Sequence, residues 1–160
     1  MDGHITTDQP VLVPVDFSSS SAEALVWAGD LAERLDAPLI ILHVIHDVAP
    51  GSYVRTEEGS LERYETAATA MMSDFVDRVA QRQPSVADGE RIVVEGLPVT
   101  RILEVARNRN AQHIVMGSRG RTGLSHLFLG SKAERVVQLA PIPVTIVKKD
   151  LPELELDPQL

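Results

Sequence analysis

Glycine and hydroxyl residues gather in one stretch of this chain, residues 117–131. Gly117 and Gly120 would let the backbone turn sharply and approach a ligand with no Cβ in the way. Gly130 and Ser131 stand where the last predicted helix begins. The free N–H groups of a helix N-terminus favour an anion, and the Ser131 hydroxyl adds a donor. A strand, a glycine loop and a helix N-terminus in this order predict a phosphate-binding site.

Each of these glycines also has an ordinary structural interpretation. Glycine is common in the turn that follows a strand, and Gly-Ser is common at the start of a helix. The stretch is not a P-loop, because Gly-x-x-x-x-Gly-Lys-[Ser/Thr] does not occur, and it lacks the Gly-x-Gly pair of the dinucleotide fingerprint. The spacing alone therefore leaves a phosphate ligand and plain turn chemistry as equal interpretations.

Other reactive side chains give weaker signals. His43, His46, His113 and His126 match no zinc-ligand spacing, and the chain has no cysteine to support them. Only Asp16 and His126 are expected near the glycine loop, and neither has an evident partner for acid–base or nucleophilic chemistry. The pattern therefore predicts binding and assigns no catalytic residue.

The elements that position these residues follow from hydrophobic periodicity. Strands are expected at residues 11–15, 39–45, 91–95, 113–116 and 142–147, with amphipathic helices between them. The alternation predicts an α/β fold with a parallel sheet and helices on both faces. Ligands in such folds bind beyond the carboxyl ends of strands, which is where Asp16 and Gly117 fall.

Local signals set finer expectations. Pro14 lacks a ladder donor and should mark the fading end of the first strand. Glu23 follows Ser20 in capping-box register, among several serines that could cap the first helix. Residues 46–60 are predicted to be loop. The second long helix is predicted from Leu61 to Val79, with both Met71 and Met72 on its buried face.

Composition limits the class of protein. The 160 residues are 44% hydrophobic, enough for one packed domain, and carry a net charge of −8, which argues against a nucleic-acid partner. The apolar run at residues 38–45 is too short to span a bilayer, and nothing resembles a signal peptide. The sequence predicts a soluble cytoplasmic protein with no membrane insertion.

The glycine spacing belongs to a wider set of motifs. Gly117-x-x-Gly120, nine residues, and then Gly130-Ser131 resembles the nucleotide-binding motif of the universal stress proteins. The similarity covers about residues 10–148. It continues through Val13-Pro-Val-Asp16-Phe-Ser, Gly96-Leu-Pro98, Ile114-Val-Met-Gly117, Ala133-Glu134-Arg135-Val136 and Pro143-Val144. Each motif is weak alone, and the set is specific.

The resemblance implies a Rossmann-like, adenine nucleotide alpha hydrolase-like fold: one open five-stranded parallel sheet in the order 3-2-1-4-5. A nucleotide-binding domain is expected over residues 10–148, between a flexible N-terminus at 1–9 and a flexible acidic tail at 149–160. Family members with the full glycine motif bind ATP, so ATP is the implied ligand. The contacts carried over by the resemblance are Pro14, Val15, Asp16, Val44, Met116, Gly117, Gly120, Gly130 and Ser131, with Asp16 placed to act through a nucleotide-bound Mg or Mn ion.

Two positions depart from the family pattern. His113 stands where the family often has Asp, and Lys132 follows Ser131 where a small or apolar residue is usual. Lys132 could reach a terminal phosphate as a point charge, or it could be a solvated lysine at a helix start.

The resemblance also implies a homodimer. Residues 144–147 would form a sheet edge, and an exposed apolar edge is hazardous unless it is covered. Pairing with a second copy would cover it; the alternative is a monomer whose edge is guarded by Lys148 and Lys149.

The sequence therefore predicts an ATP-binding stress-response protein in which nucleotide occupancy is a regulatory state signal, and not primarily an enzyme. Two alternatives remain. One is slow ATP hydrolysis or self-phosphorylation, with Ser131 or Thr122 as acceptor. The other is an interaction module that works without nucleotide, through its acidic tail and residues 51–60.

Overall fold

The computed structural model describes residues 8–46, 49, 51–119 and 129–149. Its centre is a five-stranded sheet in which every neighbouring pair is parallel. The strands are β1 (Val11–Pro14), β2 (Leu39–Ile45), β5 (Glu90–Glu95), β6 (His113–Gly117) and β7 (Val144–Val147). Their spatial order is β5-β2-β1-β6-β7, which is the predicted order 3-2-1-4-5. The predicted fold class is confirmed.

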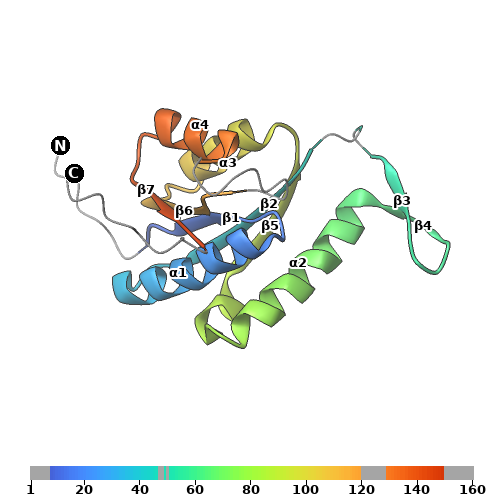
Figure 1. The fold of residues 1–160 in the computed structure, drawn as a ribbon, viewed down its shortest axis with the longest axis horizontal. Helices are drawn as coiled ribbons and strands as arrows, with labels where there is room; N and C mark the ends of the chain where they lie inside the picture. Colours follow the sequence, from blue (N-terminus) through green and yellow to red (C-terminus); the bar gives the residue numbers. More distant parts are fainter. Residues whose placement is uncertain (1–7, 47–48, 50, 120–128, 150–160) are drawn as a thin grey trace, which may run out of the picture.

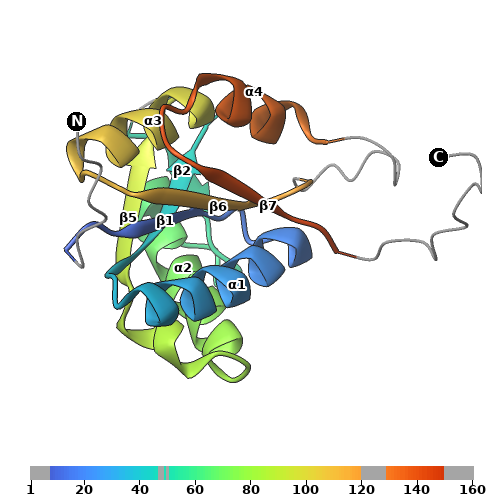
Figure 2. The same cartoon turned by 90° about the vertical axis from the view of Figure 1, so that its left-hand side faces the viewer.

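Helices cover both faces of this sheet. Figure 2 shows α1 (Ser19–Leu35) and α2 (Tyr64–Ala80) on one side, and α3 (Pro98–Asn108) and α4 (Ser131–Leu139) on the other. Successive side chains of β1 enter opposite layers: Val11 and Val13 pack with α1 and α2, and Leu12 packs with α3 and α4. The central strands are therefore apolar at nearly every position, as strands buried on both faces must be.

Two proline predictions are confirmed. β1 ends at Pro14, and sheet contact continues through the Val15 N–H, which donates to the Leu42 carbonyl at 2.8 Å. Pro98 occupies the first turn of α3, where its missing N–H removes no helical hydrogen bond. β7 begins at Val144, later than the predicted residue 142, with only the Pro143 carbonyl before it bonded to the sheet.

A β-hairpin stands where loop and helix were predicted, and that prediction was wrong. β3 (Tyr53–Arg55) pairs antiparallel with β4 (Leu61–Arg63), so α2 begins only at Tyr64. Gly59 supports the turn with a φ of 84°, in the left-handed region. Leu61, expected in the core, is 66% exposed. Figure 1 shows the hairpin standing away from the sheet beyond the N-terminal end of α2.

The buried face of α2 admits only one of the two methionines. Met72 is 1% exposed and Met71 is 45% exposed, so the prediction that both are core was wrong for Met71. Neighbouring helical residues point about 100° apart, and α2 packs against the sheet along one stripe only.

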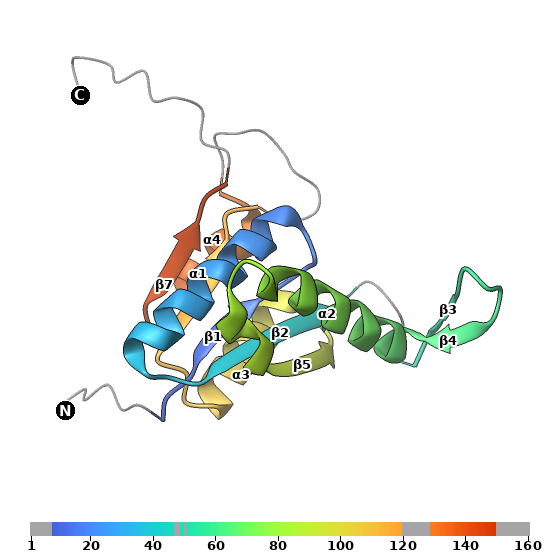
Figure 3. The same cartoon turned by 90° about the horizontal axis from the view of Figure 1, so that it is seen from below.

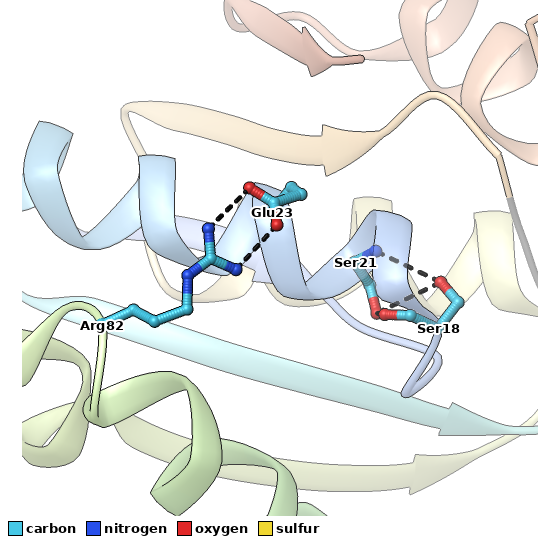
Figure 4. A network of polar contacts seen from close by, with 4 residues as sticks. All are labelled: Ser18, Ser21, Glu23 and Arg82. Carbon is cyan, nitrogen blue, oxygen red and sulfur yellow. Dashed lines mark hydrogen bonds and ion pairs between the residues drawn. The ribbon is translucent and has the colours of Figure 1, made fainter. Parts of the chain in front are cut away.

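The first helix is capped by Ser18, one of the serines predicted as cap candidates, and not through the predicted capping box. The Ser18 hydroxyl accepts from the Ser21 N–H at 3.2 Å, so Ser18 is the N-cap and the capping box of Ser20 with Glu23 does not form. Glu23 instead makes a bidentate ion pair with Arg82, at 2.7 and 3.0 Å (Figure 4). The Arg82 side-chain hydrogen bonds hold the pKa of Glu23 below its usual value. Tertiary contact with the segment after α2 therefore outweighs the local cap.

Candidate functional site

The carboxyl end of the sheet gathers most of the predicted site residues. Pro14, Val15 and Asp16 end β1 or follow it, and Met116 and Gly117 end the neighbouring strand β6. Val44 lies near the end of β2, while Gly130, Ser131 and Lys132 begin α4. The chain goes from β1 to a helix on one face, and from β6 toward a helix on the other, which creates the crevice where ligands of such sheets bind. Gly120, Thr122 and His126 lie outside the described residues.

Asp16 is held by the turn into α1. Its Oδ1 accepts from the Ser18 N–H at 3.0 Å, and its own N–H donates to the Ser21 hydroxyl at 3.3 Å. The Ser21 hydroxyl in turn donates to the Ser18 carbonyl at 3.0 Å, beside the cap shown in Figure 4. The half-buried Asp16 side chain is therefore fixed beyond β1 by the start of the following helix.

Phe17 holds this turn in a strained conformation. Its φ is 65°, a value that a bulky residue adopts only when its surroundings impose it. The ring of Phe17 stacks on His43 and meets Phe75 edge-on, with ring centroids 4.2 and 5.5 Å away. Nδ1 of His43 donates to the Val15 carbonyl oxygen at 2.9 Å, which also fixes the strand before Asp16. The sequence analysis assigned Phe17 no role; the signal available was the polar His43 inside an apolar strand.

Gly117 is required by the packing of α1 against the end of β6. A Cβ there would lie 2.4 Å from the Ser20 hydroxyl oxygen and 2.9 Å from the Ser20 carbonyl carbon and oxygen. The N-terminus of α1 thus rests directly on the end of β6. This packing role was not foreseen from the sequence, and the expected approach of Gly117 to a ligand stays a prediction.

The N-terminus of α4 fits an anion. Its N-cap is Gly130, which offers no side-chain cap to the first N–H groups of the helix. The Gly130 N–H donates to the Ser118 carbonyl at 2.7 Å, which ties the helix start to the end of β6. Ser131 and Lys132 are exposed beside these N–H groups. Free N–H groups, a hydroxyl and an ammonium together are a suitable set of phosphate donors.

Lys132 reaches across the crevice to β2. Its Nζ lies 3.0 Å from Nε2 of His46, just beyond the end of that strand. An ammonium can only donate, so Nε2 is the acceptor in this contact and Nδ1 is the ring nitrogen left to donate, 3.5 Å from the Val44 carbonyl oxygen. The sequence analysis considered His46 only as a metal ligand and did not foresee this contact.

Three of the predicted nucleotide contacts, Val15 and Val44 at the adenine and Met116 at the ribose, divide between the two layers of the core. Val44 and Met116 are both 7% exposed and pack together in the α3 and α4 layer. Val15, 4% exposed, points into the α1 and α2 layer instead. Only the backbone of Val15 can therefore share a site with the side chains of Val44 and Met116.

Three observations bear on other kinds of site or contact. Among the described residues, no group of three or more His, Cys, Asp or Glu side chains could hold a metal ion, so Asp16 there has no partner set for a protein-bound cation. A hollow of about 500 Å³ lies at the opposite end of the sheet, lined by Asp8, Glu33, Asp36 and Asp88. Its carboxylates would repel a phosphate, which separates it from the predicted site. No helix in the described part of the chain is long and apolar enough to cross a bilayer.

Comparison with known sequences points to one protein family. The model of the universal stress protein family matches residues 9–148. A universal stress protein of Methanocaldococcus jannaschii is 34% identical over 144 residues, with 87% of this chain and 81% of the relative covered. A universal stress protein of Mycobacterium tuberculosis is also 34% identical, but the match, 89% of this chain, spans only 46% of that relative's length.

Solved structures share the fold. A universal stress protein in complex with cAMP is 27% identical with a TM-score of 0.65, and 91% of this chain and 100% of that chain are covered. A universal stress protein from Archaeoglobus fulgidus in complex with dAMP is 25% identical with a TM-score of 0.62, covering 89% of this chain and 100% of that chain.

Proposed function

Because the chain belongs to the universal stress protein family, we propose that it binds ATP at the carboxyl end of the sheet and that nucleotide occupancy is a regulatory state signal in a cytoplasmic homodimer. The observation that carries this proposal is the start of α4, where a helix N-terminus without a side-chain cap, Ser131 and Lys132 lie beside the ends of β6 and β2. The cAMP and dAMP complexes of similar proteins support an adenine nucleotide as the ligand class.

The residues present fit such a ligand. The N–H groups of α4, the Ser131 hydroxyl and the Lys132 ammonium would hold phosphates. The strand ends at Val44 and Met116 would border the base and the ribose. Asp16, fixed near the start of α1, would hold a divalent ion only together with phosphate oxygens, because one carboxylate is too few ligands for Mg or Mn.

Nucleotide could act as a signal through the connection between β6 and α4. A hydrogen bond from the Gly130 N–H to the Ser118 carbonyl joins the two ends of that connection. Phosphate bound at the start of α4 would therefore influence both of these ends. A ligand shifts a protein between states by its difference in affinity for them. A partner that contacts this connection would therefore distinguish the filled site from the empty one.

The homodimer rests on the free edge of β7. The Pro143 and Val147 carbonyls accept from β6, at Ile114 and Ser118, each at 3.0 Å. In a parallel ladder the residues between them, Val144 and Ile146, turn their N–H and C=O groups away from β6. This edge is short, apolar and half-buried, which suits pairing with a second copy.

Isothermal titration calorimetry with ATP tests the binding proposal. Ser131→Glu places a negative charge among the α4 donors and should abolish binding by repulsion from the phosphates. Thr100→Glu is the matched control, because it makes a similar change in the first turn of α3, and it should leave affinity unchanged. Wild-type affinity in Ser131→Glu would overturn the site. Turnover of labelled ATP in the same samples, against a Gly130→Asp variant, tests the enzymatic alternative.

One observation favours the nucleotide-independent alternative. The β3–β4 hairpin overlaps residues 51–60, the segment expected to mediate interactions, and stands away from the sheet (Figure 3). Tyr53 and Leu61 on this hairpin are 60% and 66% exposed. Capture of the same partners by wild type and by Ser131→Glu would favour this second function over nucleotide signalling.

A further inference from the structure

Resting on the nucleotide site proposed above, we propose that His46 and Lys132 form a terminal-phosphate subsite that makes this chain discriminate adenine nucleotides by the length of their phosphate chain. Lys132 supplies the charge, and His46 is the positioning residue. The inference comes from the 3.0 Å contact between Lys132 Nζ and His46 Nε2, which joins the start of α4 to the end of β2.

The geometry places a fixed cation beside the phosphate donors. An unrestrained lysine in the first turn of a helix would sample solvent and lose side-chain entropy on binding an anion. The contact with His46 restrains the Lys132 side chain toward the crevice before any ligand arrives. Only one of the three donors of the ammonium is used in this contact, which leaves two for phosphate oxygens.

The chemical nature of the partner preserves the charge. A carboxylate at position 46 would neutralise the ammonium and compete with an anionic ligand. A neutral imidazole accepts one hydrogen bond and leaves the full positive charge available. In a chain with a net charge of −8, such a local cation matters for a polyanionic ligand.

The consequence is selectivity for polyphosphates. The start of α4 can hold one phosphate through its N–H groups and Ser131, which is all that a monophosphate or a cyclic monophosphate presents. Each further phosphate adds negative charge that needs another cation. Lys132, adjacent to Ser131 and held toward β2, is a cation placed to meet it.

Calorimetric titration of the full chain with AMP, ADP and ATP tests this inference. Wild type should bind ATP at least about tenfold more tightly than AMP, the ratio expected from one charge-assisted hydrogen bond. Lys132→Gln should lower ATP affinity about tenfold and AMP affinity less than about twofold. Arg107→Gln, which removes a positive charge from the exposed last turn of α3 at the other end of the sheet, should change neither.

The positioning role of His46 has its own readout. His46→Leu removes the acceptor and should reduce the ratio of ATP affinity to AMP affinity. His46→Gln retains an acceptor and should keep that ratio near the wild-type value. A loss of ATP affinity in both variants, or equal losses for ATP and AMP, would overturn the role of His46.

The two proposals fail in different ways. Equal affinities of wild type for AMP and ATP, or equal losses for both in Lys132→Gln, would overturn the subsite while leaving the nucleotide site standing. Absence of binding of all three nucleotides to wild type would overturn the proposed function together with the subsite.

Discussion

The imidazole of His43 stacks on the ring of Phe17, with the ring centroids 4.2 Å apart and the planes inclined by 26°. The stack joins β2 to the residue that follows Asp16. Phe17 keeps its φ of 65° because His43 and Phe75 hold its ring. The direction of the Asp16 side chain therefore depends on aromatic packing between elements distant in the sequence.

Substitution of Phe17 separates backbone strain from ring packing. Phe17→Ala and Phe17→Gly both remove the stack, but only glycine adopts the left-handed backbone freely. Phe17→Gly should therefore be more stable than Phe17→Ala by about 1 kcal/mol, the reverse of the usual order of these residues. Urea unfolding of both variants measures the difference, and a less stable glycine variant would show that the turn is not strained.

Gly117→Ala should destabilise the protein by about 2 kcal/mol, because its Cβ would overlap Ser20 on α1. Ser20→Ala should recover part of this loss in the double variant, since it removes the nearest atom but leaves the backbone of Ser20 in place. Chemical unfolding of the four proteins gives the coupling energy. Full additivity of the two substitutions would contradict the contact.

His113 should make stability depend on pH. Burial lowers the pKa of His113 below its ordinary value of about 6.5, so the unfolded chain binds a proton more readily than the folded one. This contribution to stability is complete above about pH 6.5 and is lost as the pH falls below it. His113→Gln should flatten the fall in melting temperature between pH 7 and pH 5. Parallel profiles for wild type and variant would refute the assignment.

Ile146→Pro should convert the proposed dimer into a folded monomer. Its N–H points away from β6, so proline there removes a donor only from the outer edge of β7. Ile146→Ala shortens the side chain but keeps that N–H, and should remain dimeric. Sedimentation velocity measures the masses, and circular dichroism checks folding. A dimeric, folded Ile146→Pro would exclude this edge as the interface.

Much of the fold could be predicted because its signals are local. The apolar runs of β1 and β2 are continuous since both faces are covered, and the prolines Pro14 and Pro98 mark element ends by lacking a donor. The hairpin was not predicted because its strands leave Tyr53 and Leu61 exposed. The sequence there therefore lacks the alternation of apolar and polar residues that marks a half-buried strand. Helical spacing from Leu61 onward then extended α2 too far.

The sequence by itself determined the alternation of the five sheet strands with the four long helices, the family, and the presence of Asp16, Ser131 and Lys132 at element ends. It could do so because periodicity and motif spacing are properties of the chain. Only the tertiary structure decided what those residues contact. Ser20 fills the space beside Gly117. The stacked rings of Phe17 and His43 fix the turn at Asp16, and His46 contacts Lys132. These partners come from elements far apart in the sequence, and their distances depend on how the helices pack on the sheet, which no local pattern encodes.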